Sequence, residues 1–209
     1  MHNPTEKVWI ALKRLLRYLK GTRHYGLVVK KGVNITPIIY ADADYGNCTQ
    51  TRKSTSGVSV IIGGISVINI SKQQKIVTKS TTESEYIAAS LATTELLWLN
   101  KLFNETKIIV LFKPLDLMID NQPAINLINH NQSSSRTKHI DIQYKFIQQY
   151  AENMILKVQK VHTNDNVADI FTKSLGKTKF LAFRDMLGVT PSSLKNQDSG
   201  SESKGIHES

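Results

Sequence analysis

The chain has 209 residues, of which 40% are hydrophobic, and a formal net charge of +10. Its single cysteine excludes an intrachain disulfide framework, and no apolar run approaches the roughly 20 residues that cross a bilayer. This length suits one compact domain with appendages or two small ones, and no secretory signal is apparent, so we expect an intracellular protein without membrane contact.

The first predicted element is a basic, amphipathic helix that follows Pro4 and ends at Gly21. Its apolar residues recur at helical spacing, and a glycine readily takes the positive φ of a helix C-terminus. Residues 1–31 hold eight Lys and Arg against one acid, which is +7 of the net charge of +10. Such a concentration attracts polyanions, although a solvated helix face is the alternative interpretation. The side chains that we expect to contact nucleic acid are Lys13, Arg14, Arg17 and Lys20 here, and Arg52 and Lys53 beyond the helix.

The elements that follow predict a mixed α/β sheet. Strands are expected at 36–42, 56–62, 65–71, 115–120 and 154–161, and helices at 81–104, 122–130, 139–152 and 165–175. Gly63 and Gly64 mark a two-residue hairpin turn. Strand 115–120 arrives through a helix, so we expect it to lie parallel to strand 36–42 and beside it. The expected fold class is α/β, with a five-stranded mixed sheet (three antiparallel strands, then parallel ones) flanked by helices.

Three regions are expected along the chain. Residues 1–33 form the basic helical segment, and residues 34–188 form the sheet domain. Residues 189–209 are polar and rich in Ser, Lys and Glu, without apolar periodicity, so we expect a disordered tail there.

Two acids follow neighbouring strands of this sheet. Asp42 ends the strand at 36–42 and Asp120 ends the strand at 115–120, and parallel neighbours end at the same edge of a sheet. Because open α/β sheets carry their sites at that edge, we expect the two carboxylates to lie close together. Each has a local alternative, since Asp42 suits a turn and Asp120, shortly before Pro123, suits a helix N-cap.

The long helix contributes a third acid, and its pattern separates Glu85 from Glu83. Ser80 and Glu83 match a capping box, in which Glu83 reaches back to a free backbone N–H. Glu85 instead heads an apolar stripe with steps of three and four residues. The stripe continues through Ala89, Ala92, Leu96, Leu99 and Phe103. An acid that faces the sheet needs a partner or a cation, unless Glu85 reaches out over the first turn into solvent.

A fourth acid and a histidine complete the candidate site. Asp169 lies in the first turn of the last predicted helix, where its alternative role is interaction with the helix dipole. His162, after the strand at 154–161, could handle protons near a leaving group, or it is an ordinary loop histidine. Oxygen-rich clusters suit Mg²⁺, and two such ions can activate water and stabilise a leaving oxygen. The set predicts hydrolysis of a nucleic-acid backbone, with the first three carboxylates within roughly 4–5 Å of one another.

Seven short motifs occur along the chain in a distinctive order. They are Tyr-Ala-Asp-Ala-Asp (40–44), Arg-Lys-Ser-Thr-Ser-Gly (52–57), Ser-Lys-Gln-Gln (71–74), Ser-Thr-Thr-Glu-Ser-Glu-Tyr-Ile-Ala (80–88), Asp-Asn-Gln-Pro-Ala (120–124), Arg-Thr-Lys-His-Ile-Asp (136–141) and Ala-Asp-Ile-Phe-Thr-Lys (168–173). Together they resemble the ribonuclease H domain of copia-type long-terminal-repeat retrotransposon Pol polyproteins. Residues 1–5 and 17–22 are similar to the segment that connects the reverse transcriptase of that family to its ribonuclease H.

The resemblance implies a ribonuclease H-like fold and metal-dependent cleavage of the RNA strand of RNA–DNA hybrids during reverse transcription. Two Mg²⁺ ions are implied, with Mn²⁺ as an alternative. By similarity, Asp42 bridges both ions and Asp169 binds the second. Glu85 and Asp120 bind the first ion and help to orient the attacking water. His162 matches a mobile histidine near the departing product.

The resemblance also implies partners and a location. The partners are an RNA–DNA hybrid and the reverse transcriptase domain of the same polyprotein, and the location is cytoplasmic, within virus-like particles, with the nucleus as an alternative. A catalytically idle module, which binds or tethers nucleic acid in a degenerate element copy, stays open. It would suit the departures from the family pattern at Tyr45, Gly46 and Asn69, none of which is an expected ligand. Another polynucleotidyl transferase of the same fold is disfavoured by the specific motifs.

Overall fold

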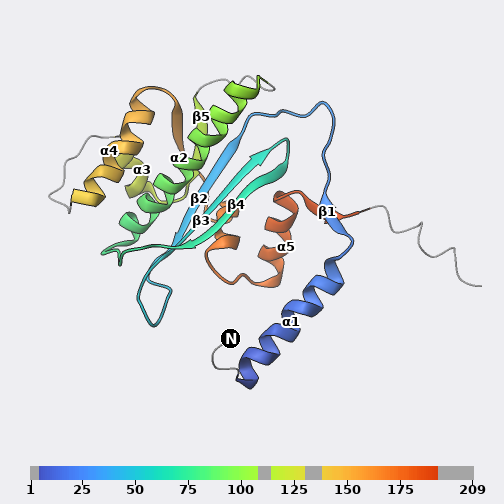
Figure 1. Ribbon diagram of the computed structural model, residues 1–209. Helices are drawn as coiled ribbons and strands as arrows, with labels where there is room; N and C mark the ends of the chain where they lie inside the picture. Colours follow the sequence, from blue (N-terminus) through green and yellow to red (C-terminus); the bar gives the residue numbers. More distant parts are fainter. Residues whose placement is uncertain (1–4, 108–113, 130–137, 193–209) are drawn as a thin grey trace, which may run out of the picture. The chain divides into compact units, whose positions relative to one another are not determined.

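A computed structural model describes residues 5–107, 114–129 and 138–192 (Figure 1). The chain divides into two compact units, the larger formed by Val29–Leu187 and the smaller by Met1–Val28 with Gly188–Ser209. Among the described helices, none combines the length and the apolar character that a membrane crossing requires.

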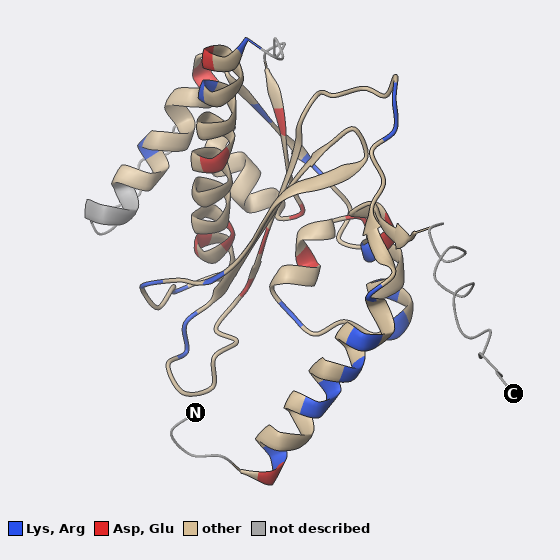
Figure 2. Ribbon diagram, turned by 45° about the vertical axis from the view of Figure 1, so that its right-hand side comes forward, with Lys and Arg blue, Asp and Glu red and all other residues tan. Residues whose placement is uncertain are grey.

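The smaller unit consists of one helix and a two-stranded sheet. Helix α1 (Glu6–Thr22) begins after Thr5, whose side chain accepts a hydrogen bond from the Val8 N–H at 3.4 Å. None of the residues of α1 is buried, and Lys and Arg follow the helix along its length (Figure 2). Strand β1 (Tyr25–Leu27) pairs antiparallel with β7 (Val189–Pro191).

The structure places the first residues of the expected tail in strand β7. The Ser192 N–H also donates to the His24 carbonyl at 2.6 Å. A three-residue strand is stabilised by backbone hydrogen bonds to its partner, so it needs no apolar periodicity of its own. Residues 193–209 lie outside the described residues.

The larger unit is built on a five-stranded mixed sheet in the order β4-β3-β2-β5-β6. Its strands are β2 (Ile38–Asp44), β3 (Thr55–Ile62), β4 (Ile65–Gln73), β5 (Leu115–Ile119) and β6 (Leu156–Lys160). β3 is antiparallel to both β2 and β4, whereas β5 is parallel to both β2 and β6. The predicted sheet is therefore confirmed, including the position of the fourth strand beside the first.

The turn between β3 and β4 is the predicted two-residue hairpin. Gly63 has a φ of 61° and Gly64 a φ of 79°, so both residues adopt the left-handed region. Glycine occupies that region without the steric penalty of a Cβ atom, which explains the pair of glycines at this position.

Helices lie against both faces of the sheet (Figure 1). They are α2 (Thr81–Thr106), α3 (Gln122–Asn129), α4 (Lys138–Glu152), the 3₁₀ helix η1 (Val167–Phe171) and α5 (Lys177–Met186). α2 packs on β2 and β3, and α4 packs on α2. Side chains alternate along β3, so Val58 faces the core under α2, while a Cβ atom at Gly57 would face η1 on the other side.

The start of α2 confirms the different roles of its two acids. The Ser80 hydroxyl accepts from the Glu83 N–H at 3.1 Å, and a Glu83 carboxylate oxygen accepts from the Lys79 N–H at 2.7 Å. Glu83 therefore caps the helix, as the capping box predicts. The stripe that Glu85 heads is buried from Ala89 to Leu99, which confirms the helical phase.

The prediction of a last helix at 165–175 is wrong in its extent. The structure has the short helix η1 and then a separate helix, α5, that the sequence pattern did not predict. The buried Asn166 side chain donates to the Ala41 carbonyl of β2 at 2.9 Å and accepts from the Ala168 N–H at 3.3 Å. The bond to Ala41, across 125 positions of the chain, docks η1 on the sheet, and a contact at that separation leaves no mark on local periodicity.

Candidate metal centre

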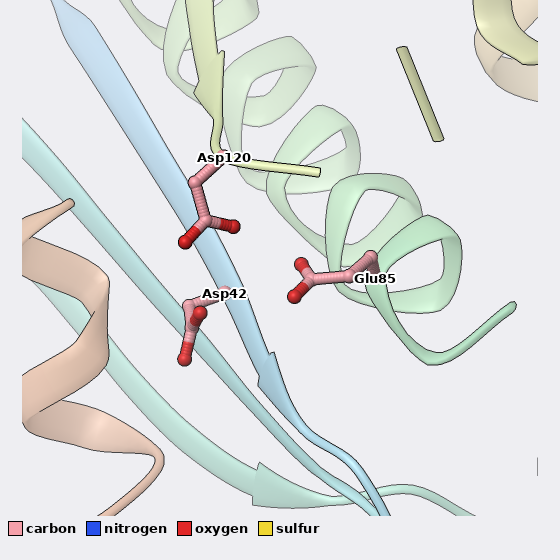
Figure 3. A group of neighbouring side chains, drawn as sticks. All are labelled: Asp42, Glu85 and Asp120. Atoms are coloured by element: carbon pink, nitrogen blue, oxygen red, sulfur yellow. The ribbon is translucent and has the colours of Figure 1, made fainter. Parts of the chain in front are cut away.

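Three carboxylates from separate elements converge at one edge of the sheet (Figure 3). Asp42 lies near the end of β2, Asp120 follows the last residue of β5, and Glu85 points towards them from the first turns of α2. One oxygen from each residue lies within 4.8 Å of the others. This spacing falls within the range that the sequence predicts for ligands of a shared cation.

The three acids differ in exposure, and the more buried two have raised pKa values. Asp42 is 1% exposed and Glu85 is 7% exposed, whereas Asp120 is half-buried. Burial, together with the charges of Asp42 and Asp120, raises the pKa of Glu85 to about 9. Burial also raises the pKa of Asp42 to about 6, against the opposing effects of a hydrogen bond from Thr172 and the charge of Lys173. The raised pKa values of the two carboxyl groups indicate that the site favours a bound proton or another positive charge.

A divalent cation fits these residues. Within the described part of the chain, Oε2 of Glu85 is buried and has no hydrogen-bond partner. A buried polar oxygen without a partner costs free energy, and a bound cation would remove that cost. The donor set consists only of carboxylate oxygens, which suits Mg²⁺ or Mn²⁺ better than metals that prefer nitrogen or sulfur ligands.

Asp169 lies outside this group of three acids and is paired with lysines. It is fully buried in η1, with Oδ1 2.6 Å from Lys173 Nζ and Oδ2 in contact with Lys179 Nζ. Thr172 in turn donates a hydrogen bond to Asp42 Oδ2, so η1 is tied directly to the acid of β2. The predicted role of Asp169 in binding a second ion stays a prediction.

Sequence reasoning missed both lysines. Lys173 stands four residues after Asp169, a spacing that brings side chains together on a helix and could have suggested the pair. Burial lowers the pKa of Lys173, but the hydrogen bond to Asp169 and the negative charges of Asp42 and Asp169 outweigh burial and raise it. Lys179 belongs to α5, and no local signal connects it to Asp169.

Two of the remaining predicted residues, His162 and Arg52, are exposed and lie in loops of the larger unit. His162 is exposed, and its Nδ1 accepts from the Asn164 N–H at 3.2 Å in the turn after β6. Arg52, also exposed, donates its backbone N–H to the Cys48 carbonyl at 2.7 Å in the loop before β3. The roles of His162 near the product and of the basic residues in nucleic-acid contact stay predictions.

The raised pKa of Glu85 predicts that the metal-free protein loses stability as pH rises. An unfolded glutamate releases its proton near pH 4.5, whereas folded Glu85 keeps it until about pH 9, so the folded state binds more protons between these values. The free energy of unfolding therefore falls with increasing pH through this window. In EDTA, we expect the melting temperature of the wild type to fall relative to that of Glu85→Gln between about pH 5.5 and about pH 8.5, as measured by circular dichroism.

Glu105→Gln is the control for this measurement, because it removes one exposed acid from the other end of the same helix. The melting temperature of Glu105→Gln should change with pH as that of the wild type does, across the whole pH range. Added Mg²⁺ should restore the wild type at high pH, since ligand binding stabilises the folded state. A melting-temperature difference between wild type and Glu85→Gln that stays the same at every pH would contradict the burial of this carboxylate.

The chain is similar to transposon Pol polyproteins. No protein-family model matches it. It is 39% identical over 190 residues to the retrovirus-related Pol polyprotein from transposon RE1 of Arabidopsis thaliana, a match that covers 91% of this chain and 13% of that protein. It is 36% identical over 191 residues to the one from transposon TNT 1-94 of Nicotiana tabacum, covering 90% and 14%. The chain thus spans about one seventh of the length of these relatives.

Solved ribonuclease H structures share part of the architecture. The N-terminal ribonuclease H domain of a Mycobacterium tuberculosis protein matches with a TM-score of 0.49 and 12% identity, over 73% of this chain and 98% of that one. LC11 ribonuclease H1, in complex with an RNA/DNA hybrid, matches with a TM-score of 0.48 and 15% identity, over 66% and 94%. The observed strand order and connections are those of the expected α/β fold class with a five-stranded mixed sheet.

The sequence matches agree with the resemblance of the motifs. They extend over about nine-tenths of the chain, and they are found in Pol polyproteins of transposons from two plants. The motifs around the three converging acids resemble the same family. Over about nine-tenths of its length the chain is therefore similar to part of retrovirus-related Pol polyproteins of plant transposons, in agreement with the resemblance of its motifs to the copia type.

Proposed function

We propose that this segment is an endonuclease that hydrolyses the RNA strand of RNA–DNA hybrids during reverse transcription, using divalent cations. The observation that carries the proposal is the convergence of Asp42, Glu85 and Asp120, with oxygens within 4.8 Å, on the edge of a ribonuclease H-like sheet. Similarity to retrotransposon Pol polyproteins supports the choice of substrate, because reverse transcription produces RNA–DNA hybrids.

The three acids would hold the cation, and each is positioned by its own element. The Asp42 carboxylate accepts a hydrogen bond from the Thr172 hydroxyl, which orients it. Asp120 directly follows β5, the parallel neighbour of the strand that carries Asp42. Glu85 would release its proton when the cation binds, since the positive charge reverses the effect of burial. A bound Mg²⁺ would supply an activated water and a positive charge for the leaving oxygen.

The other residues and partners in the proposal rest on the resemblance. Asp169 would bind a second ion, and His162 would handle a proton near the departing product. The basic residues of α1, together with Arg52 and Lys53, would contact the nucleic-acid backbone. The reverse transcriptase domain of the same polyprotein would be the partner, and cytoplasmic virus-like particles the location.

A panel of labelled duplexes tests the proposal. Purified protein with Mg²⁺ should cut the RNA strand of an RNA–DNA hybrid, leaving 3′-hydroxyl and 5′-phosphate ends, and EDTA should abolish the cut. RNA–RNA and DNA–DNA duplexes of the same sequence should stay intact. Binding to the hybrid without any cleavage would favour the catalytically idle module, and cleavage of the DNA duplex would favour a different polynucleotidyl transferase.

A further inference from the structure

A lysine ammonium group lies beside the three-acid site, between one of its members and Asp169. Lys173 Nζ is 2.6 Å from Asp169 Oδ1 and 3.7 Å from Asp42 Oδ2. Two carboxylates of two different elements therefore share one positive charge. A position that faces two carboxylates in this way is a cation position, and here the chain fills it with its own side chain.

Lys179 forms an ion pair with the other carboxylate oxygen of Asp169. Its Nζ contacts Asp169 Oδ2, donates to the Thr163 carbonyl at 3.3 Å, and lies 5.0 Å from the centre of the Phe183 ring. Both oxygens of the fully buried Asp169 are thus engaged by ammonium groups. A divalent ion can reach Asp169 only where one of the two lysines leaves.

Charge balance separates the first ion from a second. When all of them are ionised, the four carboxylates and the two lysines have a combined charge of −2, which one divalent ion cancels. A second ion would leave an excess of +2 unless an ammonium group moves away or new negative charge arrives. The phosphates of a nucleic-acid backbone would supply such charge.

Lys173 is the more exposed of the two lysines. Its side chain is 37% exposed, against 30% for that of Lys179. It also lines an open cavity of about 440 Å³ with Asn47, Leu175 and Phe180. The Lys173 side chain can therefore swing out without unfolding η1, while Lys179 has a further bond to a backbone carbonyl.

From this geometry we infer that Lys173 is an internal cation that fills the second metal position of the substrate-free protein. The free protein then binds one divalent ion tightly, at Asp42, Glu85 and Asp120. A second ion binds only when a polyanion draws Lys173 away from the two carboxylates. This inference rests on the proposed function, since it concerns the same metal site.

Titration with Mn²⁺, followed by calorimetry and electron paramagnetic resonance without nucleic acid, tests the inference. The wild type should bind one ion tightly. Lys173→Met should bind a second ion at least about tenfold more tightly than the wild type does, because the competing charge is gone. Lys173→Arg should keep one tight site. Lys179→Met is the matched control: it removes a charge from the same acid but leaves the shared position filled, so it too should keep one site.

Several results would overturn the inference. They are two equal sites in the wild type, a single site in Lys173→Met that has a wild-type circular dichroism spectrum, or an equal gain in Lys179→Met. The wild-type titration needs no variant, so it decides even where Lys173→Met does not fold. Failure of the proposed function would look different: the wild type would then bind no ion tightly, or Asp42→Asn would bind ions as the wild type does.

Discussion

Asp42→Asn is expected to reduce cleavage of an RNA–DNA hybrid by at least about 10³-fold, a loss of about 4 kcal/mol of transition-state stabilisation. Asp42 is the acid with the most contacts in the site: oxygens of Glu85 and Asp120 lie within 4.8 Å of its own, Thr172 donates a hydrogen bond to it, and Lys173 Nζ lies 3.7 Å from its Oδ2. An amide removes the negative charge that binds the cation but still accepts the Thr172 hydroxyl hydrogen bond. The fold should therefore survive, and only cation binding and cleavage should be lost.

Asp44→Asn is the matched control, because it makes the same chemical change two residues away. Asp44 is the last residue of β2, pairs with Thr55 of β3, and does not belong to the group of three converging acids. In single-turnover assays with a labelled hybrid at saturating Mg²⁺, this variant should cleave the RNA strand at a rate close to that of the wild type. If Asp42→Asn and Asp44→Asn cleaved equally well, the metal centre would be misassigned.

Gly57→Ala is expected to lower the free energy of unfolding by about 3 kcal/mol, at the upper end for an overpacked core. A Cβ atom at Gly57 would lie 2.6 Å from the Ala168 carbonyl oxygen and 2.6 Å from a Thr172 methyl carbon. The first of these atoms is backbone, so η1 itself would have to move away from the sheet. Because Gly57 pairs with Asp42 across β2 and β3, that movement should also withdraw Thr172 from Asp42 and slow cleavage.

Gly176→Ala is the control for this prediction. A Cβ atom at Gly176 meets no other atom within 4 Å, and the residue has an extended conformation that alanine adopts readily. Gly176 is the N-cap of α5, where alanine is less favourable than glycine, so urea unfolding should show a loss of no more than about 1 kcal/mol for this variant. Equal unfolding midpoints for Gly57→Ala and Gly176→Ala would show that η1 does not pack closely on β3.

The sequence by itself determined the elements whose signals are local. The capping box assigns Glu83 to the helix start, and helical phase turns Glu85 towards the sheet. The crossover rule places the strand that ends at Asp120 beside the one that ends at Asp42, as observed. Period, capping and handedness depend on near neighbours in the chain, and these three acids could be predicted to meet for that reason.

Only the tertiary structure decided how Asp169 relates to the other acids. Its ion pairs with Lys173 and Lys179 depend on where η1 and α5 dock. Docking of η1 depends on bonds such as the one from Thr172 to Asp42, between residues 130 positions apart. Contacts at that separation are set by packing and charge in the folded chain rather than by local pattern. The sequence therefore predicted which acids are present and where three of them meet, and the fold decided which cations of the chain itself accompany them.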